Sequence, residues 1–294
     1  MNGVLVIDKP SGPTSFGVVQ RVRSLLKVNK AGHTGTLDPN ATGVLPICVG
    51  AATKLAGLLA EGKKAYLATI RFGIETDTQD AAGQKIAEAP VPELSNALLE
   101  SALSSFRGSI MQVPPMHSAV KVGGKRLYQL ARAGEHVSLQ PRPVTVDQLA
   151  LLDFSSNEAT VSITCSKGFF VRSLAHDLGR ALGCGGHLKT LRRTASGPFT
   201  LQQAITLDRM VELCRQHKPG AEQLGQHLIP TADAVRDLPA IRVSAQDAIR
   251  VSHGVPIEWP AGAGRVRVLG PDDSLLAIAE LGKGPRLKYY RVLV

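Results

Sequence analysis

A loop rich in glycine and proline constrains this chain more than any other segment, because it fixes the backbone around one carboxylate. Residues 31–46 read AGHTGTLDPNATGVLP, with Asp38 near the middle. Pro39 has a fixed φ and steers Asp38 away from helical dihedrals, while glycines such as Gly43 allow positive φ or close backbone approach. An Asp-Pro pair taken alone is more often a helix start, with the aspartate as N-cap. The run therefore predicts either a helix N-terminus or a rigid loop that presents the Asp38 carboxylate.

The charge balance favours an anionic partner. The chain of 294 residues has 34 lysines and arginines against 24 aspartates and glutamates, a formal net charge of +10. Such a balance favours nucleic acid, although charge alone does not distinguish RNA from DNA or from acidic lipid. The apolar run at residues 4–7 is too short for a signal peptide or a membrane span. We therefore expect a cytoplasmic protein that does not associate with membranes.

Cysteine spacing and glycine patterns give no sign of a cofactor. The four cysteines are widely spaced and form no CxxC pair: Cys48, Cys165, Cys184 and Cys214. Neither a zinc site nor a disulfide framework is indicated. The basic segments 61–64 and 123–126 lack the glycine spacing of a phosphate loop and the serine or threonine that follows it. We expect no metal and no cofactor.

Hydrophobic patterns predict a mixed α and β architecture. Strands are expected at residues 4–7, 45–49, 66–72 and 161–165. Helices are expected from Ser15, which can act as a cap, and at residues 92–106 and 171–182. The first helix has an apolar stripe formed by Val18, Val19, Val22, Leu25 and Leu26. Gly183 then ends the last of these helices.

Two later segments have a different composition. Residues 112–146 combine prolines and glycines with basic side chains, among them Lys121, which suits either a solvated loop or an insertion that grips phosphates. Past Pro239, short strands are expected at 265–269, 275–281 and 287–294, separated by glycine, proline and aspartate turns. The chain is thus predicted to end in a small β module.

The sequence around Asp38 resembles the active-site motif of the TruB-type tRNA pseudouridine-55 synthases. Other family motifs are matched in order by DKPSGPTS at residues 8–15, KAY at 64–66, PPMHSAVK at 114–121 and SKGFFVR at 166–172. The resemblance covers roughly residues 1 to 200 and is weaker beyond them. It departs at Phe170 and His117, which stand where the family commonly has tyrosine.

The resemblance implies an α+β fold with a mixed, mainly antiparallel sheet flanked by helices and loops. Residues 1–238 would form the pseudouridine synthase catalytic domain, with an RNA-gripping insertion at about 112–146. Residues 239–294 would form a PUA-like RNA-binding module.

The implied reaction converts uridine to pseudouridine at position 55 in the T loop of tRNA. Asp38 would be the catalytic carboxylate, and covalent attack at C1′, charge stabilisation at the sugar and a glycal route all stay open. Tyr66 would stack on the base and remove the C5 proton, and Arg172 would pair with Asp38. By pattern alone, Tyr66 is an ordinary core aromatic and Arg172 a surface ion pair or phosphate contact.

The family also implies residues that bind the flipped nucleotide. His33 would fill the space that the uridine leaves, Leu191 would pack against the base, and Phe170 could still stack. Lys9 would shape the pocket wall, and Lys121 would contact RNA. Without the resemblance, Leu191 is a core leucine and His33 a structural or solvated histidine.

Two other functions stay open at this stage. One is a noncatalytic protein that binds and folds tRNA in the same cleft, and the other is a guide-dependent pseudouridine synthase within a ribonucleoprotein. The chain lacks long basic extensions for such an assembly, which favours a stand-alone enzyme. We expect a monomer that acts on the tRNA T-arm without an obligatory protein partner.

Overall fold

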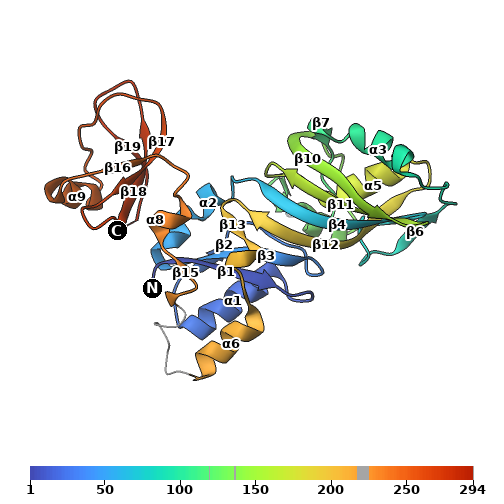
Figure 1. The fold of residues 1–294 in the computed structure, drawn as a ribbon, viewed down its shortest axis with the longest axis horizontal. Coiled ribbons are helices and arrows are strands. Elements are labelled where there is room, and N and C mark those ends of the chain that lie inside the picture. The colour runs from blue at the N-terminus through green and yellow to red at the C-terminus, as the bar shows by residue number, and fades with distance from the viewer. Residues whose placement is uncertain (119, 136, 217–224, 294) are drawn as a thin grey trace. The chain divides into compact units, whose positions relative to one another are not determined.

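Two compact units make up the fold (Figure 1). The computed structural model describes residues 1–118, 120–135, 137–216 and 225–293. One unit combines Met1–Gly62 with Ser196–Val294, and the other is Lys63–Ala195. Each unit has its own buried apolar core.

The first unit is built around β1 (Gly3–Lys9), which is buried along almost its whole length. This strand pairs antiparallel with β3 (Thr42–Val49) and β15 (Leu228–Ile229), and parallel with β14 (Ile205–Thr206). The short β2 (Ala31–His33) pairs antiparallel with β3. Other elements here are α1 (Ser15–Leu26), η1 (Gly50–Leu55), α2 (Ala56–Leu59), β13 (Phe199–Thr200), η2 (Leu201–Gln203), α6 (Leu207–Gln216) and α8 (Thr231–Ala234).

Helix α1 confirms the predicted apolar stripe but starts differently from the prediction. Thr14 is its N-cap, because the Thr14 hydroxyl oxygen accepts a hydrogen bond from the Gly17 amide at 3.0 Å. The prediction that Ser15 caps the helix is wrong by one residue, since the Ser15 hydroxyl bonds to a distant loop instead. Of the five stripe residues, Val18, Val19 and Val22 are buried, and Leu25 and Leu26 are half-buried.

The C-terminal part of the same unit is a small sheet with the strand order β16-β17-β18-β19. The predicted strands are confirmed as β17 (Gly264–Leu269), β18 (Leu275–Leu281) and β19 (Lys288–Val292), which pair antiparallel. Two elements of this part were not predicted: β16 (Ala240–Arg242), which pairs parallel with β17, and α9 (Ala245–Ser252). Three residues are too few to show an alternating pattern, which explains the missed strand.

This small sheet shares a core with the N-terminal strands. Leu269, Leu275 and Ile278 belong to one buried cluster with Val4 and Val44. Its other face has a second cluster of its own that includes residues of α9. The C-terminal sheet is therefore packed into the first unit through apolar side chains.

The second unit is a mainly antiparallel sheet with the strand order β12-β4-β11-β10-β7. Its strands are β12 (Gly186–Ser196), β4 (Lys64–Phe72), β11 (Glu158–Cys165), β10 (Arg142–Phe154) and β7 (Gly108–Gln112). A separate hairpin joins β5 (Ile74–Thr76) and β6 (Lys85–Glu88). The predicted fold class, a mixed and mainly antiparallel sheet with helices and a small C-terminal β module, is confirmed.

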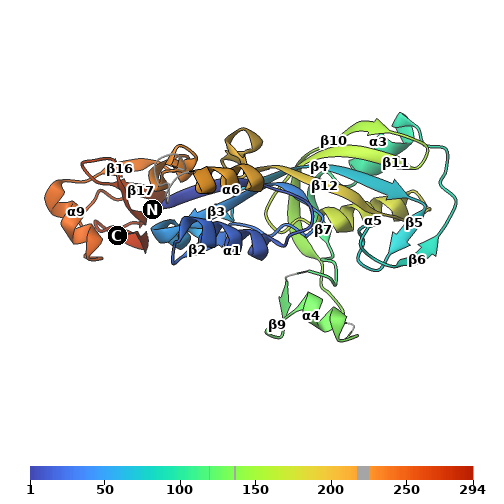
Figure 2. The ribbon, with the colours of Figure 1, turned by 90° about the horizontal axis from the view of Figure 1, so that it is seen from below.

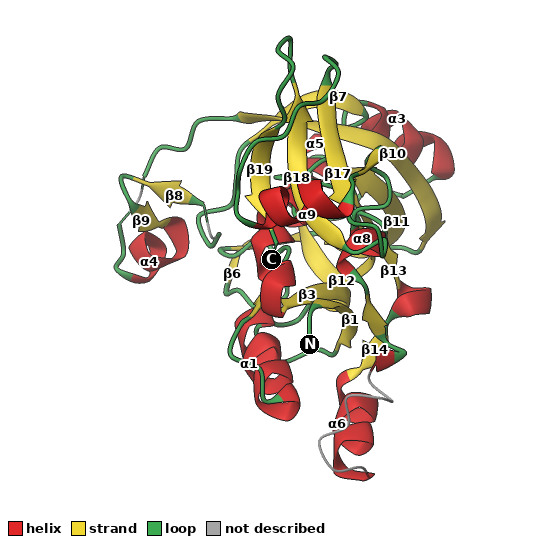
Figure 3. Ribbon diagram, turned by 90° about the vertical axis from the view of Figure 1, so that its left-hand side faces the viewer, coloured by secondary structure: helices red, strands yellow, loops and turns green. Residues whose placement is uncertain are grey.

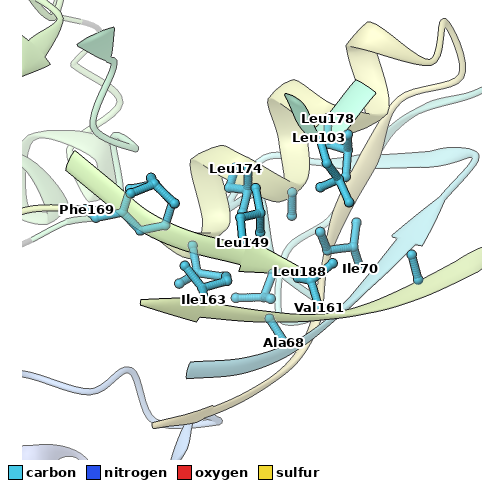
Figure 4. Close-up of a cluster of buried hydrophobic side chains, with 14 of the residues drawn as sticks. Ala68, Ile70, Leu103, Leu149, Val161, Ile163, Phe169, Leu174, Leu178 and Leu188 are labelled. Atoms are coloured by element: carbon cyan, nitrogen blue, oxygen red, sulfur yellow. The ribbon is translucent and has the colours of Figure 1, made fainter. Parts of the chain in front are cut away.

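Two predicted helices cover one face of this sheet. They are α3 (Asn96–Ser104), which Ser95 caps, and α5 (Val171–Ala181), which is followed by Gly183 at a φ of 76°. Figure 4 shows Leu174 of α5 beside Leu149 and Leu178 of α5 beside Leu103, within one buried cluster over the sheet. This core fixes α5, and hence the residues at its first turn, relative to β4 and β11.

The predicted insertion leaves and re-enters the sheet at one place, because Gln112 of β7 pairs with Arg142 of β10. Between them lie β8 (Lys121–Val122), β9 (Lys125–Arg126) and α4 (Leu127–Arg132). Gly123 and Gly124 both have positive φ, which suits the tight turn that joins β8 to β9. Figures 2 and 3 show this hairpin and α4 standing away from the sheet. The side chain of Lys121 lies outside the described part of the structure.

Candidate active site

Asp38 lies in a tight loop between β2 and β3, not at a helix start. The Asp38 carbonyl accepts a hydrogen bond from the Ala41 amide at 3.1 Å, so Pro39 and Asn40 form the centre of a turn. Proline is favoured at the first central position of such a turn because its φ is already set. Gly43, which follows, has a φ of 99°. Of the two structures that the sequence left open, the rigid loop is the one that forms.

Lys9 holds this turn from the end of β1. The Lys9 side chain is fully buried, and its ammonium donates hydrogen bonds to the carbonyls of Pro39 and Ala41, both at 2.8 Å, and of Pro10 at 2.9 Å. A buried ammonium is costly unless its donors are satisfied, so these bonds account for its burial. The Gly12 amide adds a hydrogen bond to the Pro39 carbonyl at 2.9 Å. Lys9 thus fixes the backbone that follows Asp38.

Ser15 holds the residue before Asp38 in the same way. Its buried hydroxyl accepts from the Leu37 amide at 2.8 Å and donates to the Leu37 carbonyl at 2.9 Å. Because Leu37 and Pro39 are both tied to residues of the 8–15 motif, the backbone is fixed on both sides of Asp38. The motif was predicted by resemblance, but its hydrogen bonds to the Asp38 loop were not. The carboxylate itself is half-buried.

His33 lies at the end of β2, in the strand that leads into this loop. It is half-buried and stands opposite Ile47 of β3, and the next amide, that of Thr34, donates to the Pro46 carbonyl at 3.1 Å. The structure therefore places His33 on the same pair of strands as the Asp38 loop. Its contact with a flipped nucleotide stays a prediction.

Tyr66 lies on β4 in the second unit, at the end of the strand face that forms the core. Alternation puts Tyr66 on the same face as Ala68 and Ile70, which are fully buried. Tyr66 is half-buried, stands opposite Ile163 of β11 and packs against the edge of the core cluster. The aromatic ring thus borders the core, while its hydroxyl makes a polar contact described next.

Two buried cations lie beside Tyr66, and the sequence analysis missed both. Arg193 of β12 is about 1% exposed, and its side chain shares a hydrogen bond with Tyr66. Burial lowers the pKa of the Arg193 guanidinium. Lys64, two residues before Tyr66 on β4, is also buried, and burial followed by repulsion from Arg193 lowers the pKa of its ammonium to about 8. No hydrophobicity pattern predicts that an arginine in an alternating strand points inward.

Leu191 lies two residues before Arg193 on β12, so the two side chains project from the same face of the strand. Leu191 is half-buried and packs against the core cluster that Tyr66 also borders. The predicted pair of Tyr66 and Leu191 is therefore found at the rim of one apolar core. Whether that rim receives a base stays a prediction.

Arg172 lies in the first turn of α5 and is buried. Its guanidinium donates to the His117 carbonyl at 2.9 Å and to the Thr78 carbonyl at 3.3 Å, and it lies 3.6 Å from a carboxylate oxygen of Asp80. Asp80 is in turn held by the Thr78 hydroxyl at 2.7 Å. These contacts orient the guanidinium and tie it to the start of the insertion. Since Asp38 belongs to the other unit, the pairing of Arg172 with Asp38 stays a prediction.

Gln112 positions Phe170 at the start of α5. The Gln112 side-chain amide donates to the Phe170 carbonyl at 3.0 Å and accepts from the Phe170 amide at 2.8 Å. This two-way contact satisfies backbone groups at a helix start that has no side-chain cap. Phe170 is half-buried and is held in place without the hydroxyl that a tyrosine would supply. Its stacking on RNA stays a prediction.

Within the described ranges, no group of three or more histidine, cysteine, aspartate or glutamate side chains is arranged to hold a metal ion. In the same part of the chain, every helix is too short or too polar to cross a membrane.

The fold and the family models that the chain matches define a class of protein, the pseudouridylate synthases. Residues 23–171 match the model of the TruB family pseudouridylate synthase N-terminal domain, and residues 172–236 match the tRNA pseudouridylate synthase B C-terminal domain. The solved Cbf5-Nop10-Gar1 complex contains a chain 27% identical to this one, with a TM-score of 0.78 over 99% of this chain and 85% of that chain. The archaeal box H/ACA sRNP Nop10-Cbf5 complex gives 25% identity and a TM-score of 0.77 over 99% of this chain and 86% of that chain.

Curated relatives are more similar in sequence. A tRNA pseudouridine synthase B of Symbiobacterium thermophilum is 51% identical over 87% of this chain and 83% of its own length. Its counterpart in Francisella philomiragia is 51% identical over 97% of this chain and 92% of its own length. The counterpart in Pseudomonas paraeruginosa is 44% identical over 100% of this chain and 96% of its own length. The chain belongs to the TruB family of pseudouridylate synthases.

Proposed function

We propose that this enzyme converts uridine to pseudouridine in tRNA, at position 55 of the T loop. The observation that carries the proposal is the Asp38 turn, in which Lys9 and Ser15 fix the backbone on both sides of one half-buried carboxylate. Relatives named tRNA pseudouridine synthase B, which are 51% identical over most of the chain, support the substrate. A net charge of +10 suits binding to a polyanion.

Asp38 acts at the sugar of the target nucleotide. The reaction breaks the bond between C1′ and N1, turns the uracil and joins C1′ to C5, so a carboxylate is needed where positive charge develops on the sugar. The oxygen can bond to C1′, stabilise that charge, or take the C2′ proton on a glycal route. All three need a carboxylate held in one position, which the contacts of Leu37 and Pro39 supply.

Tyr66 and Leu191 hold the turned base, and Arg172 orients the carboxylate. The two side chains border the same apolar core, which suits contact with the faces of a flipped pyrimidine. Tyr66 takes the proton from C5 in the last step. The Arg172 guanidinium, already fixed by the His117 carbonyl, pairs with Asp38 and keeps it ionised.

The surrounding surface binds the T-arm. His33 fills the gap in the RNA loop, Phe170 stacks near the pocket, and Lys121 in the insertion contacts phosphate. Residues 1–238 carry the chemistry and the small sheet of residues 239–294 adds RNA contacts. The enzyme acts as a monomer without a guide RNA or a protein partner, in contrast to the Cbf5 chains, whose solved structures are complexes.

The test is incubation of the purified protein alone with an unmodified tRNA transcript, followed by mapping of pseudouridine at each uridine. We expect modification at position 55 without a cofactor, a guide or a partner. Asp38→Asn should reduce the single-turnover rate to near background and keep most of the tRNA affinity. Asp153→Asn, which changes an exposed carboxylate on β10, is the matched control and should react like wild type.

Three results would change the proposal. Tight tRNA binding with no pseudouridine in either the wild type or Asp38→Asn would favour the noncatalytic RNA-folding function. Modification that appears only after a guide RNA is added would favour the guide-dependent function. Wild-type turnover by Asp38→Asn would remove Asp38 from the reaction.

A further inference from the structure

The pair of buried cations beside Tyr66 has no role in the reaction steps proposed above. Arg193 is one of the largest fully buried side chains among the described residues, and Lys64 is about 7% exposed. Burying an ionised group costs several kcal/mol in effective terms unless other contacts offset it. Two such groups at the edge of an apolar core therefore indicate a function that offsets this desolvation penalty.

Arg193 contacts the Tyr66 hydroxyl, and Lys64 lies on the same strand face as Tyr66. β12 and β4 are neighbours in the sheet, and the Arg193 side chain shares a hydrogen bond with Tyr66 across them. Lys64 and Tyr66 alternate onto the same face of β4. The phenol oxygen thus meets a guanidinium that comes from a different strand and is shielded from water.

The charged and titratable groups around this contact come from three strands and one loop. Cys165 of β11 stands opposite Lys64, and burial raises the pKa of its thiol to about 12, so it is neutral at working pH. Lys167 repels Lys64, and Asp147 of β10 lies near Cys165. The Lys64 ammonium has a pKa of about 8 and loses its charge as the pH rises. Arg193 stays protonated over the range in which proteins fold, so it is the lasting positive charge at Tyr66.

We propose that Arg193 is a positioning residue that holds the Tyr66 hydroxyl and stabilises its phenolate, so that Tyr66 can remove the C5 proton. This inference rests on the proposed function. In the final step the phenolate oxygen takes the proton from C5, the electrons of the C5–H bond return to the uracil ring, and Tyr66 is left as a neutral phenol. The phenol then releases its proton to solvent. A nearby guanidinium favours the charged phenolate because opposite charges attract most strongly where water is excluded.

The first experiment measures Tyr66 without any RNA, so it does not depend on the proposed substrate. Near-ultraviolet absorbance follows phenolate formation, and subtracting the titration of Tyr66→Phe isolates Tyr66 from the other three tyrosines. We expect Arg193→Met to move the Tyr66 titration to higher pH by about one unit or more, and Arg193→Lys to move it less. Arg192→Met, which changes the neighbouring side chain on the other face of β12, should leave the titration where it is.

The second experiment measures single-turnover pseudouridine formation against pH, with saturating protein and unmodified tRNA. We expect Arg193→Lys to slow the reaction about tenfold or more near neutral pH and to recover toward the wild-type rate as the pH rises. A merely structural arginine would instead lower the rate by the same factor at every pH. Thermal unfolding and near-ultraviolet circular dichroism identify variants that keep the fold, and Arg193→Lys is the variant that keeps the charge.

The two measurements separate this inference from the proposed function. An unchanged Tyr66 titration in folded Arg193→Met and Arg193→Lys would overturn the role of Arg193, even if tRNA is modified normally. A shifted titration together with no pseudouridine from the wild-type protein would support the contact and overturn the proposed substrate instead. A pH-independent loss of rate in Arg193→Lys would also overturn the role in proton removal.

Discussion

Replacing Lys9 with methionine tests how the Asp38 turn is held. The variant keeps a long apolar stem and removes the ammonium that donates to three carbonyls. The loss of stability is smaller than the contribution of three hydrogen bonds, because the Pro39 carbonyl keeps its hydrogen bond from the Gly12 amide and Pro10 is exposed to water. Of these three carbonyls, that of Ala41 loses its buried donor, a cost of roughly 1–3 kcal/mol. The methionine also avoids the desolvation of an ammonium, so we expect the free energy of unfolding to fall by about 1–2 kcal/mol.

The effect on catalysis should exceed the effect on stability. Without the hydrogen bonds from Lys9, the turn allows Asp38 to shift, and a misplacement of about 1 Å can lower the rate by a factor on the order of 100. We therefore expect Lys9→Met to lower the single-turnover rate by roughly 10- to 100-fold, while the dissociation constant for tRNA changes little. Denaturant unfolding, tRNA binding and single-turnover modification measure the three quantities. Lys85→Met, which changes an exposed lysine on β6, is the control.

Two outcomes would refute the reasoning for Lys9. A wild-type single-turnover rate in a protein that is destabilised as expected would mean that the turn holds its shape without the ammonium. A loss confined to tRNA affinity would mean that Lys9 contacts RNA and that its hydrogen bonds to the carbonyls do not position Asp38.

Three further predictions test other parts of the molecule. Arg172→Lys keeps the charge but loses the planar guanidinium that reaches the His117 and Thr78 carbonyls, so the single-turnover rate should fall more than the tRNA affinity. Equal losses of rate and affinity would indicate that Arg172 contacts a phosphate. Hydrogen bonding to Arg180 lowers the pKa of the Glu75 carboxyl from 4.5, so this pair stabilises the fold above that pH and loses its effect as the pH falls through the lowered pKa. Glu75→Gln should thus lose a small stabilisation at neutral pH and show a shallower acid-unfolding curve, and an unchanged curve would contradict the coupling. Finally, a cavity of about 520 Å³ is lined in part by Lys27, Lys30 and Lys54. Replacing all three with glutamine should lower the slope of log affinity for tRNA against log salt concentration by up to about 0.9 for each phosphate that is no longer neutralised. An unchanged slope would mean that RNA does not reach these lysines.

Periodicity in the sequence predicted elements such as β1, β4, β11, α3 and α5, because each one buries a face whose repeat can be read locally. The two long strands β10 and β12 were not predicted. β18 was predicted with the bounds that it has, and Val18, Val19 and Val22 of the α1 stripe are buried as their spacing requires. The Asp38 loop could be predicted because glycine and proline restrict the backbone by themselves. These are effects of residues on their immediate neighbours, which one sequence contains in full.

The contacts that build the candidate site were not predictable in the same way. Lys9 reaches a carbonyl 32 residues away, Ser15 a loop 22 residues away, and Gln112 a helix start 58 residues away. Each joins a side chain to the backbone of another segment, and a backbone carbonyl has no signature in the sequence. Arg193 illustrates the same limit, because its inward direction depends on the strand beside it and not on its own neighbours. The motif positions found by resemblance therefore included Lys9 and Ser15 without revealing their contacts.

The C-terminal sheet combines a buried cluster of its own with one that it shares with the N-terminal strands, and the boundary at residue 239 stays a prediction. Short strands and turns past Pro239 predict a module of its own, and its outer cluster fits that description. Its inner face, however, places Leu275 and Ile278 in the same buried cluster as Val4 of β1, the strand that ends in Lys9. Removing residues 239–294 would expose that cluster to water, at a free-energy cost of about 25 cal/mol for each Å² of apolar surface. It would also destabilise β1, the strand from which Lys9 holds the Asp38 turn. A fall in activity on truncation would therefore combine weaker RNA binding with a loosened site. Substitutions of exposed basic residues on the C-terminal sheet, which leave its inner face intact, separate the two contributions.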